Sequence, residues 1–106
     1  MPKYLITANY VGDGVRGLMA DGGSKRVEAV TALIGSLGGT VESFYFAFGD
    51  TDAYVIVDLP DNVSAAAGSL AASASGAVTS NITVLLSPEE VDEAAAKSPS
   101  YRPPGG

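Results

Sequence analysis

The sequence predicts an α+β protein with a ferredoxin-like fold, in which helices cover one face of a four-stranded antiparallel sheet. Two observations predict this class. Strand-like and helix-like segments follow the order β-α-β-β-α-β within 106 residues. In the middle of the chain, the apolar runs Val41–Phe48 and Ala53–Leu59 flank the polar turn Gly49–Asp52 and indicate a β-hairpin.

The first half of the chain reads as a strand, a connection and a helix. Lys3–Tyr10 alternates with the period of two that is typical of a strand. Val11–Gly23 is rich in glycine and is expected to be a flexible connection, in which Asp13 could cap a short helical turn. Its glycines lack the spacing of a phosphate-binding loop or a dinucleotide fingerprint. Ser24–Leu37 has apolar residues at three- and four-residue spacing and predicts a helix that starts at its serine.

After the central hairpin, the second half reads as a helix, a strand and a further helix. Pro60–Gly76 predicts a helix of small residues, with an aspartate cap directly after the proline. Ala77–Ser87 alternates as the fourth strand, and Ser87-Pro88-Glu89-Glu90 begins an additional C-terminal helix that runs through Ala96. We therefore expect one domain over residues 1–96, followed by a tail rich in proline and glycine over residues 97–106.

The two faces of the predicted sheet differ in composition. The helix-covered face is expected to carry Ile6, Ala8, Val55, Val57, Ile82 and Val84. The opposite face is expected to carry Thr7, Asn9, Phe44, Phe46, Phe48, Tyr54, Ile56, Asp58, Asn81 and Thr83. Three phenylalanines make that face too apolar for solvent, so two copies are predicted to join through it in a homodimer with a barrel-like interior. A β-bulge would exchange the faces of a strand.

Charge and hydropathy exclude several partners. The net charge is −6, and the six basic residues are scattered, so neither nucleic acid nor an anionic membrane is an expected partner. No apolar run approaches the roughly 20 residues that span a bilayer. The N-terminus enters a strand pattern without the apolar core of a signal peptide, so a cytoplasmic location is expected.

The absence of both cysteine and histidine limits the chemistry. It excludes disulfides, thiol nucleophiles, Ser-His pairs and the usual ligands of haem and zinc. No cofactor and no metal site are therefore expected, although an all-oxygen Mg²⁺ or Ca²⁺ site stays possible. Acid–base chemistry would have to come from Asp, Glu, Lys, Tyr or bound water.

Three stretches, PKYLITANY, SLGGTVESFYFAFGDTDAYVIVDLPD and VLLSPEEVDEA, resemble the GYD family of small, largely uncharacterised bacterial proteins. The family has a Gly-x-Tyr-Asp motif before its third strand. Gly49 and Asp52 match that motif, whereas Thr51 replaces the tyrosine; Pro60-Asp61 also fits. The resemblance implies a dimeric α+β barrel and no particular chemistry. Related dimeric barrels include cofactor-free monooxygenases, isomerases and haem enzymes, and the lack of histidine argues against the haem group.

Candidate site residues lie on the predicted dimer face. Asp58 is a candidate for a carboxylate with a raised pKa that moves a proton together with Tyr54; the alternative is a structural hydrogen bond to one of the polar residues on that face. The candidate ligand-binding residues are Thr7, Asn9, Phe46 and Asn81, with Arg16 covering the mouth from the glycine-rich connection. Tyr54 and Phe46 could instead form the dimer core. Asp50 and Asp52 fit either turn chemistry or a carboxylate pair.

Three functions are consistent with these residues. The first is a homodimer, or a larger ring of dimers, that binds a small molecule or assembles through the sheet face without catalysis. The alternative is a cofactor-free enzyme of the isomerase or monooxygenase type that acts on a small, partly apolar substrate. A third possibility is a structural dimer whose tail, Lys97–Gly106, recruits a partner.

Overall fold

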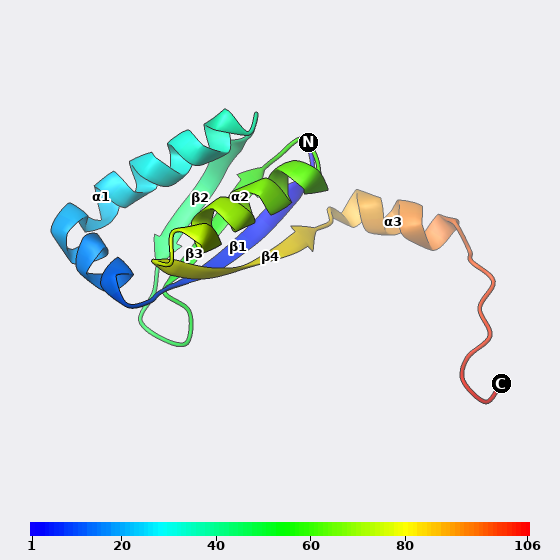
Figure 1. The fold of residues 1–106 in the computed structure, drawn as a ribbon. Helices are drawn as coiled ribbons and strands as arrows, with labels where there is room; N and C mark the ends of the chain where they lie inside the picture. Colours follow the sequence, from blue (N-terminus) through cyan, green and yellow to red (C-terminus); the bar gives the residue numbers. More distant parts are fainter.

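The computed structural model describes all residues, Met1–Gly106, and confirms the predicted fold class (Figure 1). The elements are β1 (Lys3–Tyr10), α1 (Asp13–Ser36), β2 (Thr40–Phe46), β3 (Ala53–Asp58), α2 (Asn62–Ala74), β4 (Val78–Leu85) and α3 (Pro88–Ala96). The strands form one antiparallel sheet in the order β2-β3-β1-β4. Helices α1 and α2 lie over one face of the sheet, while α3 and the tail project beyond its end (Figure 1). None of the helices is both long and apolar enough to cross a membrane.

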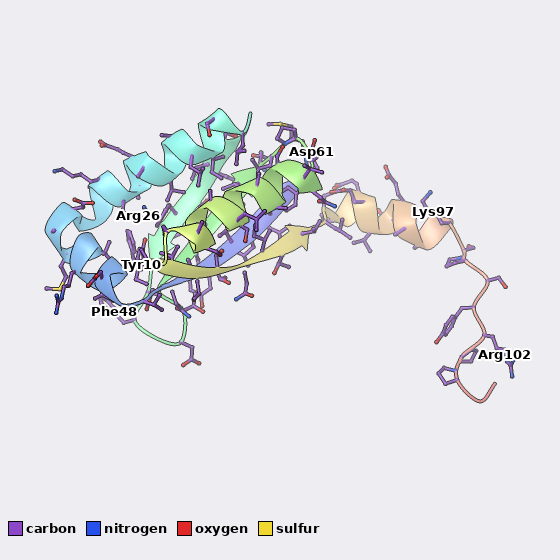
Figure 2. The ribbon with its side chains drawn as sticks, in the orientation of Figure 1. Tyr10, Arg26, Phe48, Asp61, Lys97 and Arg102 are labelled. Atoms are coloured by element: carbon purple, nitrogen blue, oxygen red, sulfur yellow. The ribbon has the colours of Figure 1, made fainter.

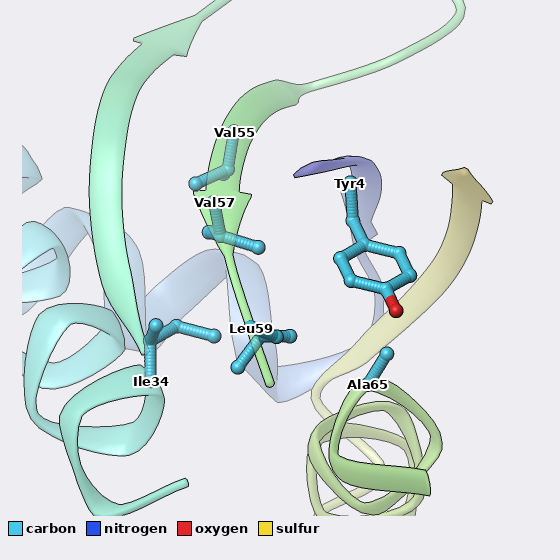
Figure 3. Packing of buried hydrophobic residues seen from close by; sticks show 6 residues of the cluster. All are labelled: Tyr4, Ile34, Val55, Val57, Leu59 and Ala65. Carbon is cyan, nitrogen blue, oxygen red and sulfur yellow. The ribbon is translucent and has the colours of Figure 1, made fainter. Parts of the chain in front are cut away.

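The hydrophobic core lies between the sheet and the two covering helices (Figure 3). It contains six buried residues: Tyr4, Ile34, Val55, Val57, Leu59 and Ala65. The Tyr4 hydroxyl donates to Asn62 Oδ1 at 2.6 Å, so its burial leaves no polar atom unsatisfied. Only nine of the 106 residues are buried, which means that one subunit encloses a small core.

The start of α1 differs from the prediction. The helix begins at Asp13, with Gly12 as its N-cap, and the expected flexible connection is a first helical segment. Gly22, with φ 77°, bends the backbone and separates this segment from the predicted one. The glycine-rich sequence disfavours a helix, but Gly14 lies so close to the Ala77 carbonyl that an added Cβ would collide with it. This tertiary contact overrides the local preference.

The phenylalanines of β2 do not lie on the face of the sheet that the sequence predicted. The register of β2 against β3 shifts between Val41 and Ser43, which marks a β-bulge. A bulge inserts one residue and reverses the alternation beyond it. Phe44 and Phe46 consequently lie on the helix-covered face, with ring centres 5.0 Å apart, and Phe44 packs against the core. Phe48 lies beyond the end of β2 in the hairpin loop and is fully exposed.

The other face assignments are confirmed by the strand register. Thr7 lies opposite both Tyr54 on β3 and Asn81 on β4, while Ile6 lies opposite Val55 and Ile82 on the helix side. We call the side of the sheet without helices the open face. It carries Leu5, Thr7, Asn9, Tyr45, Tyr54, Ile56, Asp58, Thr79, Asn81, Thr83 and Leu85.

Candidate functional site

A row of polar and aromatic side chains crosses the open face. In register across the four strands, Tyr45 lies opposite Tyr54, Tyr54 opposite Thr7, and Thr7 opposite Asn81. The row brings three of the predicted site residues together. Tyr45 was not among the residues predicted for this face, because it alternates with Phe44 and Phe46 and the pattern alone does not reveal the bulge. Tyr45 and Tyr54 are 71% and 43% exposed, so this row is accessible in one subunit.

Asp58 forms an ion pair at one end of the open face. Lys3 Nζ donates to both of its carboxylate oxygens, at 3.0 and 3.2 Å, and to Glu42 Oε1 at 3.4 Å. The hydrogen bond from Lys3 to Asp58 raises the pKa of the lysine, and Glu42 adds to this effect. The partner of Asp58 is thus a lysine at the start of β1, rather than one of the polar residues that the sequence suggested.

Asp58 and Tyr54 do not share a reaction site within one subunit. The two residues are four positions apart on the same strand. At a rise of about 3.3 Å per residue, their Cα atoms are about 13 Å apart, and both side chains stand roughly perpendicular to the sheet. They cannot both contact the same small group on a bound molecule.

Asn9 and Asp52 connect the hairpin loop to the end of β1. The backbone N–H of Asp52 donates to Asn9 Oδ1 at 3.0 Å, and Asp52 Oδ2 accepts from the backbone N–H of Tyr10 at 3.0 Å. These contacts are structural, because each satisfies a backbone group beyond the β1–β3 ladder. Asp50, in the same loop, is exposed and makes no side-chain hydrogen bond, so the two aspartates do not act as a pair.

The remaining predicted residues lie elsewhere. Phe46 lies on the helix-covered face, away from the row across the open face. Arg16 lies on the first segment of α1, where it is exposed and makes no ion pair. No three acidic side chains gather as a metal-binding group.

A cavity of about 70 Å³ lies between the sheet and the two covering helices. Apolar side chains from both layers line most of it, among them Ile6, Val30, Leu33, Phe44 and Val55. On α2, Gly68 and Ala72 face the same space, and their small size leaves it unfilled. The sequence showed that α2 is made of small residues, but it gave no indication that a cavity would remain beneath them.

Arg26 and Tyr10 are among the polar residues that line this cavity, and their side chains lie near each other (Figure 2). Arg26 Nε donates to the Tyr10 hydroxyl at 3.3 Å, and the guanidinium carbon lies 5.7 Å from the centre of the tyrosine ring. Both side chains are half-buried. Arg26 is not one of the apolar residues that predict this helix. Its position four residues before Val30 nevertheless places it on the same side of the helix as the apolar stripe.

The strand order, the helices on one face and the uncovered opposite face define a ferredoxin-like α+β protein. The sequence profile of the GYD domain matches residues 4–95, which is most of the chain. The protein therefore belongs to the GYD domain family. No curated protein and no solved structure matches the chain. Asp52, at the position of the aspartate in the motif, makes the structural contact to Tyr10 described above.

Proposed function

We propose that the protein is a homodimer with a small-molecule-binding role, and that the open face of the sheet is the subunit interface. The observation that carries this proposal is that no helix covers this face, although Leu5, Tyr45, Tyr54, Ile56 and Leu85 lie on it. A sheet face with this many apolar and aromatic side chains is typical of an interface.

The small core of one subunit supports the same proposal. With only nine residues buried, much of the apolar surface of the chain still faces solvent. A second copy related by a two-fold axis would cover the same face on both subunits. Thr7 and Asn81 would then be enclosed together with the tyrosines, and their polar atoms would need a partner from the other subunit, from water or from a ligand.

The enzymatic alternative has less support. Asp58 and Tyr54 are too far apart on β3 to act together within one subunit, and Asp58 is already paired with Lys3. A proton transfer that uses both residues would need one from each subunit. A binding role requires no such arrangement.

The test of the dimer is the mass of the full chain in solution, measured by light scattering after size exclusion. We expect twice the chain mass of 10.7 kDa. Tyr54→Asp places a charge in the proposed interface and should yield the monomer. Tyr101→Asp makes the same exchange on the exposed tail and should leave the mass unchanged. Circular dichroism checks that both variants fold.

A monomeric wild-type protein at every concentration tested would refute the proposal. So would a Tyr54→Asp variant that is folded and keeps the dimer mass. If instead only Tyr101→Asp dissociates the protein, the interface lies at the tail and not at the open face.

A further inference from the structure

We propose that the cavity between α1 and α2 binds a short-chain carboxylate, with Arg26 holding the carboxylate and the apolar lining enclosing the hydrocarbon. The inference deepens the small-molecule-binding role proposed above, because it names a place and a class of ligand. It concerns the helix-covered face and is independent of the dimer interface.

Arg26 has the free hydrogen-bonding capacity that an anion needs. The chain has 12 acidic residues, yet the only ion pairs in the structure are those of Lys3. A guanidinium has five N–H donors, and one of those of Arg26 is used by the Tyr10 hydroxyl. The remaining donors are without an acidic partner. A carboxylate matches this fork because it accepts two parallel hydrogen bonds.

Tyr10 fixes the position of the guanidinium. The hydrogen bond at 3.3 Å and the ring face at 5.7 Å hold Arg26 at the edge of the cavity, where both residues line it. Ordering a long side chain costs rotamer entropy on binding, and a guanidinium that is already ordered avoids much of this cost. An anion would therefore meet a preorganised donor.

The lining and the volume set the size of the hydrocarbon. Ile6, Val30, Phe44 and Val55 offer an apolar surface that a chain of methylene groups would cover. The hydroxyls of Ser69 and Ser80 also line the cavity, 3.5 Å apart, and can hydrogen-bond to each other. The volume of about 70 Å³ is several times the roughly 15 Å³ that a single water needs, so the cavity has room for a short hydrocarbon chain. Pentanoate is therefore a suitable probe.

The experiment is a titration of the full-length protein with pentanoate, followed by isothermal calorimetry and by NMR. We expect saturable binding, with the largest shifts for residues around the cavity. Pentan-1-ol and pentylamine have the same chain without the negative charge and should bind at least about tenfold more weakly, because a hydrogen bond to a charged group contributes about 1.5–3 kcal/mol. Decanoate exceeds the volume and should also bind more weakly than pentanoate.

Variants assign the binding to this cavity. Arg26→Gln should weaken pentanoate binding at least about tenfold. Lys25→Gln removes the same charge one position earlier, on an exposed side chain, and should leave the affinity unchanged. Ala72→Leu fills the cavity while it retains Arg26, so it should also abolish binding. If Arg26→Gln fails to fold, Ala72→Leu and Lys25→Gln still provide the comparison.

Three results would overturn the inference: no saturable binding of pentanoate, equal affinity for pentan-1-ol, or unchanged affinity in folded Ala72→Leu. The mass of each sample is measured in parallel. If the protein is a monomer and binds pentanoate, the proposed interface is wrong and the cavity site stands. If it is a dimer and does not bind pentanoate, only the cavity site is wrong.

Discussion

The replacement of Asp52 by alanine tests how the hairpin loop is held. The Asp52 carboxylate accepts a hydrogen bond from the backbone N–H of Tyr10 at 3.0 Å. The backbone N–H of Asp52 itself donates to Ala8 O and to Asn9 Oδ1, both at 3.0 Å. Asp52→Ala removes the first contact and leaves the backbone bonds in place. The N–H of Tyr10, at a half-buried position, loses its partner.

The expected cost follows from this single bond. A hydrogen bond to a charged acceptor contributes about 1.5–3 kcal/mol when it is buried. Water can partly replace it at a half-buried position, so we expect the free energy of unfolding to fall by about 1–2 kcal/mol. For a domain of this size, such a loss lowers the Tm by about 5–10 °C. Asp52→Asn keeps a neutral acceptor and should lose about half as much.

The assay is thermal and urea unfolding, followed by circular dichroism at one protein concentration, because a dimer makes the Tm concentration-dependent. The control is Asp50→Ala, which removes an exposed carboxylate from the same loop and should change the stability by less than about 0.5 kcal/mol. If Asp50→Ala costs as much as Asp52→Ala, the effect comes from loop charge and not from the contact to Tyr10. A stability change below about 0.5 kcal/mol in Asp52→Ala would also contradict the role given to this bond.

Three further predictions follow from the glycines and the helix caps. Gly14→Ala should strongly destabilise the protein, because its Cβ would collide with the Ala77 carbonyl, whereas Gly17→Ala, in open space on the same helix, should stabilise it by up to about 1 kcal/mol in urea unfolding. Ser87→Ala breaks the capping box of α3, whose side chains are all exposed, so it should cost that helix about 1 kcal/mol and speed its amide hydrogen exchange. The hydrogen bond from the backbone of Ser64 lowers the pKa of Asp61, so this cap should stabilise the protein above about pH 4 and lose its effect as the pH falls through the lowered pKa. The stability advantage of the wild type over Asp61→Asn, followed by unfolding from pH 7 to pH 2, should shrink in that acidic range.

The sequence predicted the secondary-structure elements well where apolar periodicity decided the structure. The limits of β1 are as expected, and those of β3 and α3 differ from expectation by at most one residue. It predicted α1 incompletely, because Gly12, Gly14 and Gly17 have low helix propensity. The contact between Gly14 and Ala77 joins residues that are far apart in the sequence, and no local pattern reveals it.

The sequence predicted only part of the candidate site, because a local pattern does not show where the strand register breaks. Alternation places side chains on one of two faces, and it fixes that choice only while the register is unbroken. One bulge before Ser43 places Phe44 and Phe46 on the helix-covered face and Tyr45 on the open face. Thr7, Tyr54 and Asn81 lie on strands without a bulge, and the sequence placed them together correctly. The cavity that Arg26 lines depends on how α1 and α2 are spaced, which the pattern along the sequence does not contain.

The proposed dimer interface and the proposed cavity site are independent of each other because they use opposite faces of one sheet. Along β1, Ile6 and Tyr10 point towards the cavity, whereas Leu5 and Thr7 point towards the open face. The backbone of a single sheet therefore separates the two surfaces, and the side chains of one do not reach the other. A dimer through the open face would leave the helix-covered face of each subunit accessible from outside. Each subunit would then keep its own cavity, and the expected stoichiometry is one carboxylate per chain.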